Sequence, residues 1–533
     1  MRRLVLIGLV LSLVAVACGD DDAGPIFTAT TTTRDIEAYP EVLVEEYVGG
    51  CVTEADEGFC RCSIDEFQRR LTLSEFLDLS PAALESSPAF EEVLQICLLQ
   101  GFGETSSTTT ETWSPPTTDS VFESITDIET ITQLTILDLE QWWATELPAV
   151  FGVTYEPVSE FGPYFSSLGD IPFCGGPLKR EEFEANAFYC SIDDTVQWDA
   201  EDLMAPLFEE FGDFTVALVL AHEWGHAVQA RFGFDDDTNL VIVSELQADC
   251  LAGSWTGRIE REESDVLRLE SGDLEEAMAG FLLIGDELGF DPADINAHGG
   301  SFDRLNAFFD GFNNGTTACA TYEDSPPDVV VIPLRVGEDP FQGGDLPLAE
   351  TAPELIAALE AFWAIVYPDV FGEPWVPVSA TIPYRPSSGE FPSCGGTTPD
   401  PVFYEGNAFY CRADDYVAWD DERLFPDLYV EIGDFAIGLI LANEWGRAVQ
   451  NRAGLPLATS AAQLQVDCLA GVWAAALIPE DNPTDIVLSA GDLEEGIAGF
   501  LTLSSSEEGE VSAFDRFESF KGGFFLGTDA CDL

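Results

Sequence analysis

The chain has 533 residues, of which 98 are acidic and 21 are basic, so its formal net charge is −77. This charge excludes binding to nucleic acid, because a strongly acidic surface repels another polyanion. With 46% hydrophobic residues and 11 tryptophans, the chain can bury hydrophobic cores, and its length predicts about three or four domains rather than global disorder.

Residues 1–17 have the pattern of an export signal. Arg2 and Arg3 precede an apolar run that is too short to span a bilayer, and small residues lead directly into Cys18. This order resembles the signal of bacterial lipoproteins, which implies cleavage before Cys18 and lipidation of that residue. We therefore expect an exported protein that is lipid-anchored to the outer face of the bacterial cell membrane. The alternative is an ordinary secretory signal in which the cysteine has no role.

Three segments follow before the main part of the chain. Residues 18–35 are a polar tether. Residues 36–102 contain four cysteines among apolar residues at helical spacing, which predicts a small disulfide-stapled helical module. Residues 103–125 are a Ser/Thr-rich linker. Setting aside the lipid-bearing cysteine leaves 12 of the 13 cysteines, an even number that suits an oxidising compartment.

The remaining sequence is one pattern written twice, at 126–322 (the first repeat) and 346–533 (the second repeat), with a linker at 323–345. "LAHEWGHAVQ" recurs as "LANEWGRAVQ", and "GDLEEAMAGF" recurs as "GDLEEGIAGF". We therefore expect two tandem domains. Each repeat has four cysteines, and sequence alone allows three connectivities for such a set. The simplest pairs neighbours: Cys174–Cys190 and Cys250–Cys319, then Cys394–Cys411 and Cys468–Cys531. Zinc binding by these thiols is a weaker alternative, because no CxxC pair occurs.

Each repeat is expected to be mainly helical. Apolar residues recur at helical spacing around "LAHEWGHAVQ", and Gly233 is expected to end that helix. The region between the first two cysteines of each repeat is rich in proline, glycine and aromatic residues, which predicts short strands and loops.

Within "HEWGH", His222 and His226 stand four residues apart. On a helix they share one face, so both imidazoles can bind one metal ion. Glu223 lies beside that ion, where it can act as general base on water. The alternative is structural, with both histidines paired to acids of this very acidic chain.

A catalytic zinc ion usually has a third protein ligand and an open position for water. In "SELQADCLAG", Glu245 and Asp249 are again four residues apart on one helical face. Glu245 is the expected third ligand, and Asp249 is expected to accept a hydrogen bond from the far nitrogen of a ligating histidine.

"AHEWGHAVQ", "SELQADCLAG", "GDLEEAMAGF" and "HGGSFDRLNAFFDGF" together resemble the putative neutral zinc metallopeptidase family, with gluzincin-like ligation, over Leu139–Cys319. The resemblance implies an α+β, predominantly helical, zincin-like domain. It also implies one Zn²⁺ bound by His222, His226 and Glu245, with Glu223 as the catalytic base. His298, in "NAHGGSFDR", is a candidate to stabilise an oxyanion in the cleft, with a surface-loop histidine as the equal alternative.

The second repeat replaces the three expected ligands by Asn443, Arg447 and Gln463, while Glu444 and Asp467 keep their acids. These replacements make a poor zinc set, so the second repeat is expected to bind no zinc and to be catalytically silent. We hypothesise that the Arg447 guanidinium occupies the vacated cation position and pairs with both acids.

These observations predict a surface-anchored zinc metallopeptidase that hydrolyses peptide or protein substrates with its first repeat and carries a pseudo-peptidase as its second. The alternative is a non-catalytic cell-surface binding or scaffold lipoprotein built on the same fold. The intact His222, Glu223, His226 and Glu245 favour the enzyme.

Overall fold

The computed structural model describes residues 127–533, apart from 167–168, 170, 235–239, 295–296, 336–337, 339–342, 479–485 and 505–510. The expected signal peptide, the lipid site Cys18, the tether, the cysteine-rich module and the Ser/Thr-rich linker lie outside these residues and stay predictions. Among the described helices, none is long and apolar enough to cross a membrane.

The first repeat opens with a long helix and a small mixed sheet. Helix α7 (Ile128–Val150) is capped by Asp127, whose carboxylate accepts a hydrogen bond from the backbone N–H of Thr130. The sheet has the order β1-β3-β2, with β3 parallel to β1 and antiparallel to β2. Its strands are β1 (Glu160–Tyr164), β2 (Ala187–Cys190) and β3 (Thr195–Asp199).

The strands lie only partly where the sequence predicts them. Of the three, β2 alone lies between Cys174 and Cys190, where the short helix α8 (Arg180–Phe183) also forms. Strand β1 precedes this region and β3 follows it. The glycines and proline directly after Cys174 turn the chain, because neither residue type supports a regular strand ladder. The expectation of short strands and loops between the two cysteines is therefore confirmed for one strand and for the loops, while the other two strands of the sheet lie outside this region.

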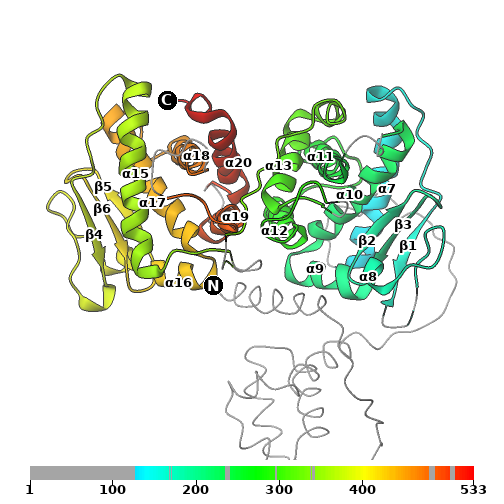
Figure 1. The fold of residues 1–533 in the computed structure, drawn as a ribbon, viewed down its shortest axis with the longest axis horizontal. Coiled ribbons are helices and arrows are strands. Elements are labelled where there is room, and N and C mark those ends of the chain that lie inside the picture. Colours follow the sequence, from blue (N-terminus) through cyan, green and yellow to red (C-terminus); the bar gives the residue numbers. More distant parts are fainter. Residues whose placement is uncertain are drawn as a thin grey trace, which may run out of the picture. The chain divides into compact units, whose positions relative to one another are not determined.

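The rest of the first repeat, as far as it is described, is helical. Helix α10 packs against α7 and α11, and α11 packs along α13 (Figure 1). Helix α10 ends at the predicted Gly233, whose φ of 83° is a left-handed conformation that favours glycine. The helices are η2 (Ala200–Met204), α9 (Ala205–Glu210), α10 (Asp213–Phe232), α11 (Val241–Glu260), α12 (Asp273–Ile284), α13 (Ser301–Asn314) and α14 (Thr316–Cys319).

Glycines set how closely these helices approach. A Cβ on Gly225, the fourth residue of "HEWGH", would lie 2.9 Å from the Cα of Ala248 on α11. A Cβ on Gly253 would lie 1.9 Å from the carbonyl oxygen of Phe308 on α13. Any larger residue would separate the helices, so glycine at these positions brings α10, α11 and α13 close enough for their polar side chains to meet.

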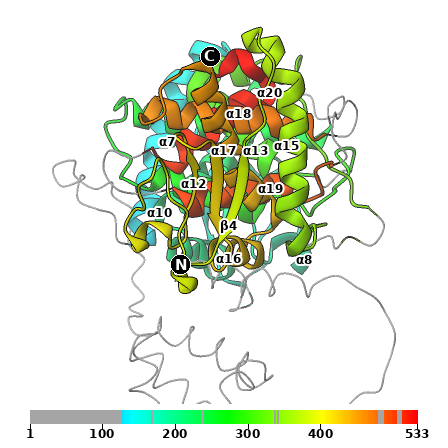
Figure 2. The ribbon, with the colours of Figure 1, turned by 90° about the vertical axis from the view of Figure 1, so that its left-hand side faces the viewer.

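The second repeat has the same order of elements. Its sheet, β4-β6-β5, repeats the parallel and antiparallel pairing of the first. Helix α15 and strand β4 face the viewer when the second repeat is seen from its own side (Figure 2). The elements are α15 (Leu348–Phe371), β4 (Ala380–Tyr384), η3 (Pro386–Ser388), η4 (Pro401–Tyr404), β5 (Ala408–Cys411), β6 (Tyr416–Asp420), α16 (Leu424–Glu431), α17 (Asp434–Ala453), α18 (Ser460–Ala476), α19 (Asp492–Leu503), α20 (Ala513–Leu526) and η5 (Gly527–Ala530).

The described chain is predominantly helical, as predicted, and contains disulfides. The bonds join the pairs that the simplest reading of the sequence gives: Cys174–Cys190, Cys250–Cys319, Cys394–Cys411 and Cys468–Cys531. Cys250–Cys319 links α11 to α14, and Cys468–Cys531 links α18 to the residue after η5. These two disulfides therefore hold helices that carry residues of the candidate sites.

The two repeats contact each other through aromatic side chains. Helices α12 and α13 face α19 and α20 (Figure 1). Phe309 stacks on Phe514 with ring centroids 4.2 Å apart, and Phe302 packs edge-on against Phe524 at 5.0 Å. At the rim, the Asn313 amide donates to the Glu518 carboxylate at 2.7 Å. The contact is therefore an apolar interface between similar helix pairs.

Candidate metal centre

The two histidines of "HEWGH" lie on α10, on the side that faces α11. Helix α10 is buried along most of its length, and His222 is 8% exposed. Their Nε2 atoms are 3.1 Å apart, so both imidazoles point at one place. The four-residue spacing of the two histidines therefore places both imidazoles on one face of the helix, as predicted.

Glu245 on α11 completes a three-residue cluster. One of its carboxylate oxygens lies 3.3 Å from His222 Nε2, and the other lies 3.5 Å from His226 Nε2. A tetrahedral zinc ion with bonds of about 2.0–2.2 Å separates its ligand atoms by about 3.3–3.6 Å. Two imidazole nitrogens and one carboxylate oxygen are also the donor set of a catalytic zinc ion. The described residues therefore fit zinc.

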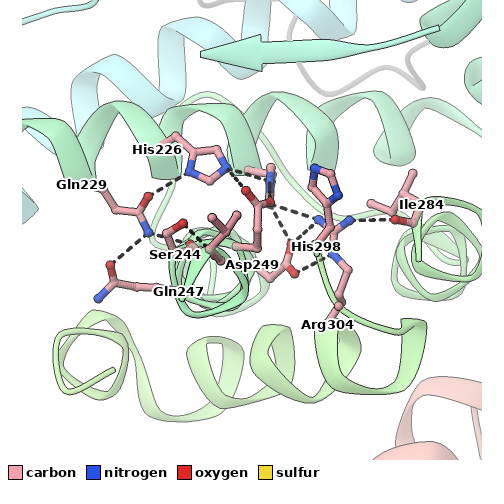
Figure 3. Close-up of polar contacts among 12 residues, drawn as sticks. His226, Gln229, Ser244, Gln247, Asp249, Ile284, His298 and Arg304 are labelled. Carbon is pink, nitrogen blue, oxygen red and sulfur yellow. Dashed lines mark hydrogen bonds and ion pairs between the residues drawn. The ribbon is translucent and has the colours of Figure 1, made fainter. Parts of the chain in front are cut away.

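The far nitrogens of both histidines are held by hydrogen bonds. His222 Nδ1 donates to Asp249 Oδ1 at 2.7 Å, as the sequence predicts. His226 Nδ1 donates to Gln229 Oε1 at 2.8 Å (Figure 3). Each bond places the ring proton on Nδ1 and leaves the Nε2 lone pair free, which is the tautomer that a metal requires.

The charges around the cluster favour a cation. Burial lowers the pKa of His222, but the carboxylates of Asp249 and Glu245 outweigh burial and raise it to about 10. Burial raises the pKa of Glu245, but the two histidines outweigh burial and lower it well below its ordinary value. Without a metal, the His222 imidazole therefore stays protonated at neutral pH, because buried carboxylates need a positive charge beside them.

Arg304 is a functional residue that the sequence reasoning missed. It lies on α13 and forms a two-point ion pair with Asp249, with Nε–Oδ2 at 2.8 Å and Nη2–Oδ1 at 2.9 Å. Its Nη1 also donates to the backbone carbonyl of Ile284 at the end of α12. Arg304 therefore fixes the carboxylate that orients His222. The available signal was the recurrence of "FDR" in both repeats.

Gln229 is the second residue that was missed. Its Nε2 donates to the carbonyl of Ser244 at 2.7 Å and to Gln247 Oε1 at 3.0 Å. Gln247 in turn donates to the carbonyl of Cys319, the partner of Cys250 in a disulfide. These bonds orient the Gln229 amide so that its oxygen faces His226. The signal here was the shared "AVQ" that follows each motif.

The remaining predicted residues lie near the cluster but outside it. Glu223 is buried on α10 and is not among the ligand atoms, which leaves its carboxylate free to act on a proton. His298 lies in the loop before α13, with its side chain 54% exposed and its Nδ1 3.5 Å from Asp286. Figure 3 shows its side chain beside the guanidinium of Arg304 and apart from His226. Its role in catalysis stays a prediction.

The corresponding position of the second repeat is filled by amides and a guanidinium. Gln463 Nε2 donates to Asn443 Oδ1 at 3.0 Å, and Arg447 Nη2 donates to Gln463 Oε1. Arg447 Nη1 donates to the carbonyl of Leu457 at 3.1 Å. Protein groups therefore satisfy each other where the first repeat has two imidazoles and a carboxylate.

The hypothesis for Arg447 is correct for one acid and wrong for the other. Arg447 Nε lies 3.7 Å from Glu444 Oε1. Asp467 is instead held by Arg516, with Nη2–Oδ1 at 2.9 Å and Nε–Oδ2 at 3.0 Å. This pair corresponds to Arg304–Asp249 in the first repeat. Because Asp467 is already paired with Arg516, it does not pair with Arg447.

Two buried oxygens in the second repeat have lost their partners. Gln450 Oε1 corresponds to the acceptor that holds His226, and it has no hydrogen-bond partner there. Glu444 Oε2 is likewise unpartnered, and burial raises the pKa of that carboxyl to about 7. Orphaned buried acceptors are uncommon, and these two correspond to Gln229, which accepts from His226, and to Glu223 in the first repeat.

Comparisons with known proteins agree with this geometry. Residues 182–322 match the family model described as "Putative neutral zinc metallopeptidase". This range contains the three expected ligands His222, His226 and Glu245. It also contains Glu223, Gln229 and Arg304. No solved structure matches the chain.

Curated relatives cover part of the chain. The uncharacterized protein YpfJ of Escherichia coli strain K12 is 35% identical over 160 residues, which are 26% of this chain and 54% of the relative. The uncharacterized protein Mb2605 of Mycobacterium bovis is 30% identical over 164 residues, which are 26% of this chain and 56% of the relative. The chain thus spans about half the length of these relatives. Residues 182–322 are therefore similar to the same putative neutral zinc metallopeptidase family that the sequence motifs resemble.

Proposed function

We propose that the first repeat is a zinc-dependent peptidase and that the second is its non-catalytic counterpart. The observation that carries the proposal is the meeting of His222 Nε2, His226 Nε2 and the Glu245 carboxylate at 3.1–3.5 Å, with both Nδ1 atoms already donating elsewhere. Once the two imidazoles lose their Nε2 protons, two nitrogen lone pairs and a carboxylate face one point, and a divalent cation stabilises them.

The protein groups divide the work of hydrolysis. Zinc, when bound by His222, His226 and Glu245, supplies Lewis-acid polarisation and lowers the pKa of water. Glu223 accepts a proton from the attacking water and delivers it to the leaving amine. Asp249 and Gln229 keep the two imidazoles in the tautomer that binds metal.

A peptide substrate suits the surroundings of Glu223. Strand β2 is an edge strand of its sheet and packs against α10, which carries the motif. An edge strand offers unpaired backbone groups that bind an extended peptide as an added strand. We therefore propose peptides or unfolded protein segments as substrates. If Cys18 carries a lipid, the protein cleaves them at the outer face of the membrane.

The test uses the full-length protein and a matched pair of variants. Glu223→Gln removes the proposed base, and Glu444→Gln makes the same change in the second repeat. We expect wild type to bind zinc and cleave casein, Glu223→Gln to keep zinc but lose at least about 10²-fold in rate, and Glu444→Gln to keep its rate. Zinc binding without any cleavage by wild type favours the non-catalytic binding role, and full activity of Glu223→Gln refutes Glu223 as the base.

A further inference from the structure

A small cavity lies where the two repeats and their connecting segment meet. Its walls come from the loop between α12 and α13, from the start of α13, from residues 330–332 and from residues around the start of α19. The volume is about 20 Å³, which is room for a single water molecule or ion. All polar side chains among the lining residues are carboxylates: Asp286, Glu287, Asp303 and Glu494.

Asp303 carries an unsatisfied oxygen into this space. The residue is 2% exposed, and its Oδ1 accepts a hydrogen bond from the backbone N–H of Val330 at 2.9 Å. Its Oδ2 has no hydrogen-bond partner among the described residues. A buried carboxylate oxygen without a partner is destabilising, so a ligand at this atom would be stabilising.

Glu494 of the second repeat points at the same place. Its Oε1 and the Oδ2 of Asp303 lie 3.6 Å and 3.9 Å from the point where a Cβ on Gly300 would stand. No basic side chain in the described part of the chain forms an ion pair with either acid; the neighbouring Arg304 is bound to Asp249. Two carboxylates from different repeats therefore share one small cavity without a counter-charge.

Local effects explain only part of this arrangement. Both acids lie in the first turn of a helix, where the free N–H groups favour negative charge. That effect does not cancel the repulsion between the two carboxylates. Burial, together with the charge of Glu494, raises the pKa of Asp303 to about 8. Without a cation, the pair keeps a proton at neutral pH.

We propose that this cavity binds a hard divalent cation of the calcium class, held by Asp303 of the first repeat and Glu494 of the second. Carboxylate oxygens are the donors that calcium prefers, while zinc favours nitrogen or sulfur. Asp286 already accepts bonds from the backbone N–H groups of His298 and Gly299, so it adds charge from the cavity wall. Water completes the coordination.

The cation bridges the repeats and is independent of the zinc centre. One ligand comes from each repeat, so binding stabilises their contact at the start of α13. Neither ligand touches His222, His226 or Glu245. Failure of the peptidase proposal would therefore leave this site untouched, and the reverse also holds.

The experiment is equilibrium dialysis of the full-length, zinc-loaded protein against radioactive Ca²⁺. High KCl suppresses diffuse binding by the acidic surface. Asp303→Asn with Glu494→Gln removes the proposed ligands. The matched control is Asp515→Asn with Glu275→Gln, the counterparts in the other repeat, where Asp515 is exposed. Glu494→Gln alone serves if the double variant does not fold, as judged by its zinc content and circular dichroism.

We expect wild type and the control to bind one equivalent of Ca²⁺ more than Asp303→Asn/Glu494→Gln. Ca²⁺ should raise the Tm of wild type and of the control only. Equal Ca²⁺ stoichiometry in wild type and the ligand variant overturns the site. Displacement of this equivalent by an equal concentration of Mg²⁺ overturns the assignment to the calcium class.

Discussion

Arg304 and Asp249 form a buried two-point ion pair, and the same Asp249 accepts the hydrogen bond of His222. The second repeat keeps this pair as Arg516 and Asp467, although its histidines are gone. The pair therefore belongs to the shared scaffold, and in the first repeat it also orients His222, a proposed metal ligand.

Replacing Arg304 should weaken zinc binding without touching a ligand. In Arg304→Gln, Asp249 loses its counter-charge and no longer fixes the His222 ring. Loss of such an outer partner lowers metal affinity by about 10–100-fold. Competition with a chromogenic chelator measures the affinity. Arg516→Gln is the matched control and should leave zinc affinity unchanged; an equal loss in both variants would point to general destabilisation instead.

Zinc binding should release protons at neutral pH. Without a metal the pKa of His222 is raised to about 10, so its imidazole is protonated, whereas zinc binds only neutral imidazole. Apparent zinc affinity should therefore rise as the pH rises from 6 toward 9, by up to about tenfold per unit. Calorimetry in buffers of different ionisation enthalpy measures the released protons, and heats that do not depend on the buffer would contradict this assignment.

Glu444 should make the second repeat less stable as pH rises. Its folded pKa is raised to about 7 from an ordinary 4.5, so the folded state holds a proton that the unfolded state has lost. Stability therefore falls between about pH 4.5 and pH 7 and then levels, by about 3 kcal/mol at most. Glu444→Gln should remove this fall in thermal unfolding followed at about pH 5 and about pH 8. An unchanged pH profile would show that Glu444 is ionised throughout.

The disulfide Cys250–Cys319 should support the metal centre, because Gln247 links the Cys319 carbonyl to Gln229. Changing both cysteines to serine should destabilise the first repeat by about 2–5 kcal/mol and lower zinc affinity. The same change at Cys468 and Cys531 should destabilise the second repeat alone. Chelator competition and thermal unfolding on both variants separate the two effects, and equal zinc affinity in the two would exclude the link.

The sequence predicts the first contacts of the site well and the supporting contacts poorly. His222, His226, Glu245 and Asp249 lie on two helices at spacings of four, and that spacing alone fixes a shared face. Arg304 lies 55 residues beyond Asp249, and its contact depends on how closely α11 packs on α13. The spacing of residues along one helix contains no information on how closely two helices pack.

In the second repeat, too, the sequence predicts the residues of the site but not all of their partners. The loss of every expected ligand is plain in the sequence, but the partner of Arg447 is not. An arginine near two acids gives no sign that one acid is already held by Arg516. The cavity between Asp303 and Glu494 is still harder to predict from the sequence, because its two acids come from separate repeats and meet only through tertiary packing.

The most direct test of the account is the number of zinc ions per full-length chain in three proteins, measured by elemental analysis. Wild type should contain one. Writing the second repeat's residues into the first, as His222→Asn, His226→Arg and Glu245→Gln, should leave none. Writing the first repeat's residues into the second, as Asn443→His, Arg447→His and Gln463→Glu, should give two, because Asp467, Gln450 and Arg516 still support the site. Two zinc ions in wild type, or one in the first-repeat triple variant, would contradict the account.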